Sequence, residues 1–116
     1  MSLSNVERID DAFECHLWLL SGKFTCETSF SFSTHSLIEA VESFKRMIDG
    51  SPGETTLRYR HEPDFIRFEM NQLGHVIVSG ELFDFALPQQ RLKFAFGTDQ
   101  TVLTPLLRDL ITLRDA

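Results

Sequence analysis

The sequence has few cysteines and no long hydrophobic run. Its two cysteines, Cys15 and Cys26, are too few for the disulfide framework of a small secreted domain, and their spacing excludes a CxxC metal or redox pair. No apolar stretch approaches the roughly 18 residues that a membrane-spanning helix needs, and the N-terminus lacks the pattern of a secretory signal. These absences predict reduced thiols, no membrane association and a cytoplasmic location.

Positive charge is also scarce. Lysine and arginine number 11 against 17 aspartate and glutamate residues, which gives a formal net charge of -6. This is the wrong sign for binding to phosphate backbones, so we do not expect a nucleic acid partner. In other respects the composition is that of a folded chain, because 42% of residues are hydrophobic and 24% are charged. A length of 116 residues matches one compact domain.

Signatures of catalysis and metal binding are missing from the sequence. It contains no GxSxG, GxGxxG, P-loop or HExxH motif. The histidines never occur at HxH or HxxxH spacing; they are His16, His35, His61 and His75. Two acid and base pairs are expected to be cross-strand neighbours, His75 with Glu81 and His16 with Glu27, although such pairs are usually solvated and inactive. We therefore expect no catalytic residue, no metal ion and no cofactor, in a protein that is not an enzyme.

An alternating pattern of apolar and polar residues begins at Phe13, as in a strand with one buried face. A second alternating run follows the turn residues Ser21 and Gly22. Pairing Leu19 with Phe24 across this turn brings the apolar sides of both runs together. The segment therefore predicts a β-hairpin, with both cysteines on its apolar side.

The rest of the chain predicts two helices and four further strands. Apolar residues recur at helical spacing in residues 36–49 and again from Leu103 to Leu113, where Thr104 is the expected cap and Pro105 the expected first helical residue. The alternating runs between the helices predict strands at residues 55–60, 65–71, 75–82 and 91–96.

This element order, ββαββββα, predicts an α+β fold. We expect a single antiparallel sheet of about six strands with two helices on one face, and an open face on the other side. Residues 1–12 are polar and acidic, and they predict a flexible N-terminal leader. Residues 13–116 then form the single α+β domain.

The expected open face carries the candidate partner-binding residues. They alternate away from the apolar side: Trp18, His16, Glu14, Glu27, Ile77 and Glu81. Trp18 has two interpretations. In the first it packs beneath the leader or a loop, and in the second it anchors a partner. The apolar run from Phe83 to Ala86 is interpreted as a plug at the sheet edge or as part of an apolar patch rimmed by charge. Such a patch is typical of a protein partner site.

The C-terminal part of the chain resembles a known family. The segment GHVIVSGEL at residues 74–82, LKFAF at 92–96, TDQT at 98–101 and the leucine-rich helix that follows are similar to the C-terminal half of the WapI-type immunity proteins. The resemblance implies a small bacterial cytoplasmic protein of contact-dependent toxin systems that binds and occludes a toxin domain. Because nuclease toxins are typically basic, the negative charge suits a basic toxin domain as partner. Within TDQT, Asp99 and Thr101 are expected to cap the turn before the last helix.

Two other function classes stay open at this point. One is a small-molecule or accessory binding module that uses the open sheet face, and the other is a hydrolase without a recognisable motif. A deep pocket with converging polar groups is typical of both, whereas a flat or shallow apolar patch favours a protein partner.

Overall fold

The computed structural model of the protein describes residues 1–86 and 88–116. The described residues form seven strands, two α-helices and one short 3-10 helix. In chain order these are β1 (Ser2–Ile9), β2 (Ala12–Ser21), β3 (Phe24–Ser33), α1 (Thr34–Ile48), β4 (Gly53–Arg58), β5 (Phe65–Met70), β6 (His75–Asp84), β7 (Gln90–Asp99), η1 (Gln100–Val102) and α2 (Leu103–Arg114). The α+β class is confirmed.

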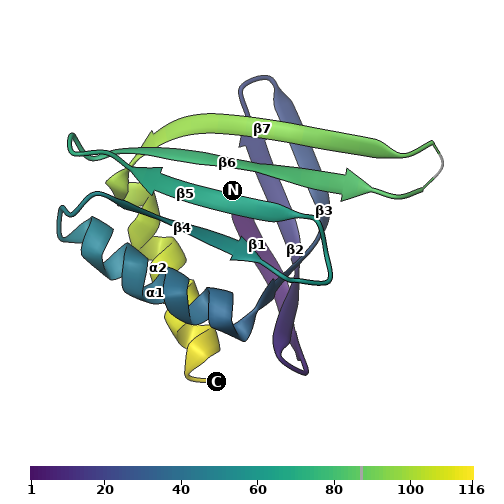
Figure 1. The fold of residues 1–116 in the computed structure, drawn as a ribbon, viewed down its shortest axis with the longest axis horizontal. Coiled ribbons are helices and arrows are strands. Elements are labelled where there is room, and N and C mark those ends of the chain that lie inside the picture. The colour runs from purple at the N-terminus through teal and green to yellow at the C-terminus, as the bar shows by residue number, and fades with distance from the viewer. Residues whose placement is uncertain (87) are drawn as a thin grey trace.

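The strands form two antiparallel sheets, so the prediction of a single six-stranded sheet is wrong. One sheet has the order β1-β2-β3 and the other the order β4-β5-β6-β7. In Figure 1, β1 to β3 cross steeply behind β4 to β7, and both helices lie towards the β4 side. A single sheet would have required β3 to pair with β4. Helix α1 instead follows β3 directly and lies against β4, so the two sheets stay separate.

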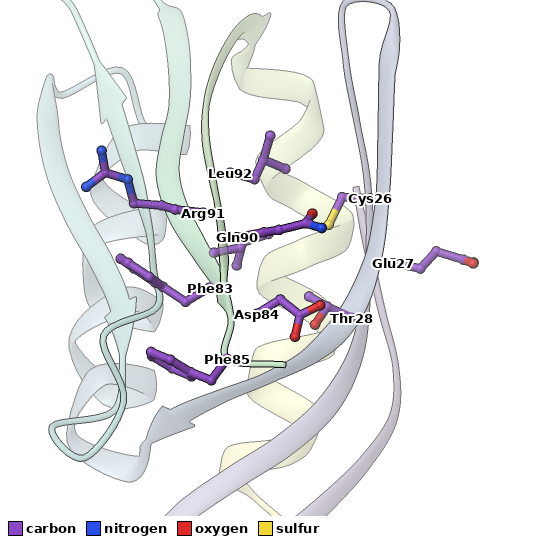
Figure 2. Close-up of a pocket in the computed structure, with 10 residues that line it drawn as sticks. Cys26, Glu27, Thr28, Phe83, Asp84, Phe85, Gln90, Arg91 and Leu92 are labelled. Carbon is purple, nitrogen blue, oxygen red and sulfur yellow. The ribbon is translucent and has the colours of Figure 1, made fainter. Parts of the chain in front are cut away.

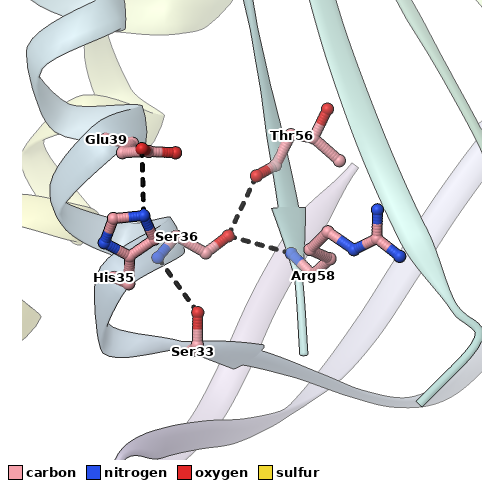
Figure 3. A network of polar contacts seen from close by, with 6 residues as sticks. All are labelled: Ser33, His35, Ser36, Glu39, Thr56 and Arg58. Carbon is pink, nitrogen blue, oxygen red and sulfur yellow. Dashed lines mark hydrogen bonds and ion pairs between the residues drawn. The ribbon is translucent and has the colours of Figure 1, made fainter. Parts of the chain in front are cut away.

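The side chain of Ser36 shows how α1 closes the edge of β4. Its hydroxyl donates a hydrogen bond to the carbonyl oxygen of Thr56 at 2.9 Å and accepts one from the backbone N–H of Arg58 at 2.9 Å (Figure 3). Both partners belong to β4, and in an edge strand such groups would be free to pair with another strand. A helix side chain therefore takes the place of a fifth strand.

The N-terminal segment differs from the expected leader, because residues 2–9 form strand β1. This strand pairs with β2 from Ser2 opposite Trp18 to Ile9 opposite Ala12. Its register shifts between Ser4 and Glu7, where Asn5 has a φ of 51°. The irregularity places Leu3 and Val6 against the core at a spacing of three residues. Such a spacing hides a strand from a search for period-two alternation.

The predicted hairpin of β2 and β3 is confirmed, with a different register. Its loop is Gly22 and Lys23, and Gly22 has a φ of 60°, which favours glycine. Leu19 therefore faces Cys26 instead of Phe24. Because the shift is two residues, every side chain keeps its predicted face.

One core lies between the inner faces of the two sheets and the helices. Helix α1 packs onto the four-stranded sheet through Phe44, whose ring meets that of Phe68 edge-on at 5.0 Å between centroids. The buried residues of β2 and β3, such as Leu17 and Phe30, belong to the same cluster. Both sheets therefore depend on a shared set of apolar contacts.

The ends of the helices partly differ from prediction. Helix α1 spans Thr34–Ile48 instead of residues 36–49, and the side chain of Ser33 caps it by accepting from the Ser36 N–H at 3.0 Å. Helix α2 begins at Leu103, so neither a Thr104 cap nor a first-position Pro105 is present. The expected role of TDQT is confirmed, because the carboxylate of Asp99 accepts from the backbone N–H of Thr101 at 2.9 Å.

Candidate functional site

The predicted site residues lie on two different outer faces. The outer face of the three-stranded sheet carries Trp18, His16 and Glu14 of β2 and Glu27 of β3, while the outer face of the four-stranded sheet carries Ile77 and Glu81 of β6. Because the inner faces of the two sheets share a core, their outer faces point away from each other. The six residues therefore do not form one patch, as a single sheet would have required.

Uncompensated negative charge marks the outer face of the three-stranded sheet. Glu7 of β1 lies directly opposite Glu14 of β2, and both side chains are exposed. Glu27 lies opposite Trp18 on the other side of β2. We call this surface the acidic face and define it by Glu7, Glu14, His16, Trp18 and Glu27. Like charges directly opposite each other destabilise a sheet, so this arrangement does not serve folding.

The predicted contact between His16 and Glu27 is confirmed. The Nε2 atom of His16 lies 3.6 Å from Oε1 of Glu27, and the two side chains are 44% and 66% exposed. Such an exposed pair contributes little to stability. The other predicted pair is wrong, because His75 and Glu81 lie six residues apart on the same strand, β6.

Trp18 is half-buried at one end of the acidic face, with Ser2 of β1 on one side and Glu27 on the other. The hairpin tip beyond it carries Leu20, 47% exposed, and Phe24, 71% exposed. Sequence reasoning assigned Phe24 to the core because it alternates with buried residues. The position of Phe24 directly beside the turn could have indicated its exposure, because β3 extends there past the elements that cover its inner face.

The outer face of the four-stranded sheet has compensated charges. The guanidinium of Arg67 contacts the carboxylates of Glu54 and Glu69, and these contacts raise the pKa of Arg67. Glu81 lies opposite Lys93 of β7. Ile77, 48% exposed, is a large apolar residue of this face. Charge here is balanced within the sheet.

A cleft of about 470 Å³ separates the edge of β3 from the far end of the β6–β7 hairpin. Figure 2 shows Gln90 pointing towards Cys26 and Asp84 towards Thr28, while Glu27 points away on the other side of β3. The cleft is open to solvent and lies between strands.

The apolar run from Phe83 to Ala86 borders this cleft. The rings of Phe83 and Phe85 are stacked with their centroids 6.0 Å apart and an interplanar angle of 8°. Phe85 is 58% exposed. The run is therefore exposed beside the cleft instead of plugging the sheet edge.

Both cysteines are free. They lie on the same side of the hairpin, but Cys15 faces Phe30, four residues along β3 from Cys26. That spacing corresponds to roughly 13 Å along a strand, beyond the reach of a disulfide. Burial and the neighbouring Glu14 raise the pKa of Cys15 to about 11, and burial also raises the pKa of Cys26. Both thiols are therefore neutral near pH 7, which makes them weak nucleophiles.

Among residues 1–86 and 88–116, no group of three or more histidine, cysteine, aspartate or glutamate side chains is placed to hold a metal ion. Within the same residues, no helix is both long and apolar enough to cross a membrane.

The fold and surface define a small α+β protein with exposed sheet faces and shallow clefts. A family model described as the Immunity protein WapI-like family matches residues 6–113. The chain therefore belongs to this family, and the resemblance seen in residues 74–113 is confirmed. Comparisons with curated proteins and with solved structures found no significant match.

Proposed function

We propose that this protein is a cytoplasmic, non-catalytic immunity protein that neutralises a basic toxin domain by binding and covering it. Membership of the WapI-like family supports the class of partner. The observation that carries the proposal is the acidic face, where Glu7 and Glu14 oppose each other across two strands. A basic partner would relieve this repulsion, so the same charges that weaken the isolated sheet would strengthen the complex.

Trp18 is the proposed anchor of the complex. Its indole lies beside Glu27 and is half-buried already in the free protein, so little side-chain freedom is lost on binding. Aromatic residues of this kind carry a large share of interface energy when a partner covers them fully. Leu20 and Phe24 extend the apolar surface at the hairpin tip. The proposed interface thus combines an apolar end, at the hairpin tip, with an acidic end at Glu7 and Glu14.

Ile77 and Glu81 stay outside this proposed interface, although sequence reasoning grouped them with Trp18. They belong to the opposite outer face, where charges are balanced. They therefore serve as internal controls for the location of the site.

A small-molecule binding module is the second candidate. The cleft beside β3 has a volume of about 470 Å³, within the range of ligand sites. Its solvent-exposed acidic and aromatic lining favours a peptide segment over a small apolar ligand.

The test of the proposal is direct binding to a toxin domain encoded beside this chain's gene. Wild-type protein should bind with an association rate that falls steeply between low and physiological ionic strength. It should also block the activity of the toxin domain at equimolar concentration. Absence of a complex, or a complex that leaves the toxin fully active, would contradict the proposal.

A further inference from the structure

The cleft beside β3 exposes the edge of a strand. Three successive residues, Cys26, Glu27 and Thr28, line it, although side chains of successive strand residues point to opposite faces. Three such residues border one cleft when the strand edge itself faces it. In the part of the chain that the structure describes, β3 pairs with β2 on one side and with no strand on the other. The backbone groups of this edge are therefore free to pair with another chain.

The opposite wall of the cleft is a two-stranded ribbon. Strand β6 pairs with β5 only as far as Glu81, which faces Phe65, whereas its pairing with β7 continues to Asp84. Beyond Glu81 the β6–β7 hairpin therefore projects without a third strand (Figure 1). Two-stranded ribbons are marginally stable on their own, so a bound segment between the ribbon and β3 would stabilise both walls.

The charge around the cleft indicates the sign of its occupant. The carboxylate of Asp84 is directed towards Thr28 across the cleft, whereas that of Glu27 points away from it (Figure 2). An adjoining depression of about 260 Å³ shares Thr28, Phe83 and Phe85 with the cleft and adds the carboxyl groups of Glu14, Glu62 and Asp64. Among the described residues that line the two hollows, Arg91 is the only lysine or arginine. Four carboxyl groups against one base favour a cationic occupant.

We propose that this cleft binds an extended, basic segment of the toxin domain, which adds to the free edge of β3. Main-chain hydrogen bonds to β3 would hold the segment, as in other cases of strand addition. One basic side chain of the segment would lie near Asp84 in the cleft, and another would reach the stacked rings of Phe83 and Phe85 in the adjoining depression. This inference rests on the proposed function for the identity of the partner.

The probe is an RVRVR peptide with blocked ends, which combines strand propensity with positive charge. It is titrated into the isotope-labelled full chain and followed by NMR, with an EVEVE peptide as the charge-reversed control. Saturable shifts should occur in residues 26–28, 83–85 and 90–92, together with slower exchange of β3 amide hydrogens. The EVEVE peptide should cause none of them. Absence of shifts for RVRVR, or shifts confined to the acidic face around Trp18, would overturn the proposal.

Two variants and one matched control locate the binding site. Phe85→Ala removes an exposed ring and should weaken RVRVR binding at least about fivefold. Asp84→Asn should weaken it about as much, while its side-chain oxygen still accepts from the N–H of Ala86. Ile38→Ala removes an apolar side chain of similar exposure, 47%, from α1 and should change binding less than about twofold. Equal effects of Phe85→Ala and Ile38→Ala would overturn the proposal.

The toxin domain gives the second arm of the experiment. If wild-type protein binds it and Phe85→Ala and Asp84→Asn bind equally well, the cleft proposal is wrong and the proposed function stands. If wild-type protein does not bind the toxin domain, the proposed function is wrong, and the RVRVR titration still decides whether the cleft accepts basic segments.

Discussion

On the outer face of the four-stranded sheet, Arg67 lies between Glu54 and Glu69 and Lys93 faces Glu81, whereas on the acidic face Glu7 faces Glu14. The first arrangement neutralises charge within the fold. The second places like charges directly opposite each other, at a cost of a few tenths to about 1 kcal/mol. We infer that the two faces have separate roles, the balanced one serving the fold and the acidic one serving a partner.

Both sheets share one core and should therefore unfold as one unit, which the largest expected effects test. Phe30→Ala in the three-stranded sheet and Phe68→Ala in the four-stranded sheet should each destabilise the protein by about 3 to 5 kcal/mol, because both rings lie in the shared core. Phe44→Ala should behave in the same way, since its ring packs on Phe68. Chemical denaturation followed by fluorescence and circular dichroism should give one coincident transition for each variant. Two separate transitions would show that the sheets fold independently.

Binding is expected to separate the two faces next most strongly. Trp18→Ala on the acidic face should weaken toxin binding by about 2 kcal/mol or more and change folding stability by less than about 1 kcal/mol. Ile77→Ala, the control on the opposite face, should leave binding within about twofold of wild type. Surface-based kinetics and thermal melts measure the two quantities. Unfolding of the Trp18 variant would identify the indole as a core residue, and equal losses for both variants would remove the distinction between the faces.

Charge neutralisation should affect stability and binding in opposite directions on the acidic face. Glu14→Gln removes the repulsion with Glu7 and should raise the free energy of unfolding by about 0.2 to 1 kcal/mol. The same change should slow association with a basic toxin domain and flatten its salt dependence. Glu69→Gln on the balanced face removes a partner of Arg67 and should lower stability slightly without changing association. Urea denaturation and stopped-flow kinetics at two ionic strengths measure these effects. A Glu14→Gln variant that is less stable and binds equally fast would contradict the comparison.

The smallest expected effect is a loss of stability at alkaline pH. Burial in the folded protein raises the pKa of Cys15 to about 11, from an ordinary value of 9.0 for a cysteine thiol. Between these values the folded state keeps a proton that the unfolded state loses, so stability falls as the pH rises through 9. The loss from this group should be about a few tenths of a kcal/mol at pH 9, and Cys15→Ser should reduce this slope.

The oxidation state of the cysteines is measured with the same protein. In denaturant without reductant, a thiol reagent should titrate both cysteines, and in the native state Cys26 should react faster than the buried Cys15. A protein without free thiols in denaturant would contradict the cysteine assignment.

Local patterns in the sequence predicted most of the elements and the faces of their side chains. Alternation placed Phe13, Leu17 and Leu19 inside and Trp18 towards the outside, and a two-residue error in register left these faces unchanged. Helical spacing likewise located α1 within two residues at each end. These features depend on neighbours in the chain, which the sequence displays directly.

The arrangement of the strands depends on distant contacts, and here prediction failed. Alternation does not reveal which edges pair, and the hydroxyl of Ser36 that closes β4 has no signature in the sequence. For the same reason, Ile77 was grouped with Trp18 although the fold separates them. The cleft beside β3 was not foreseen, because it exists only where two sheets cross.

The bond between Ser36 and β4 also limits how copies of the protein could assemble. A hydrogen-bonded sheet grows like a polymer, by adding units at its ends, and the four-stranded sheet has ends at β4 and β7. Helix α1 and the Ser36 hydroxyl occupy backbone groups at the β4 end. At the β7 end, the hydroxyl of Ser21 donates a hydrogen bond to the carbonyl oxygen of Ala95 at 3.2 Å. Side-chain hydroxyls from outside this sheet therefore occupy backbone groups at both of its ends, which disfavours its growth by the addition of further strands.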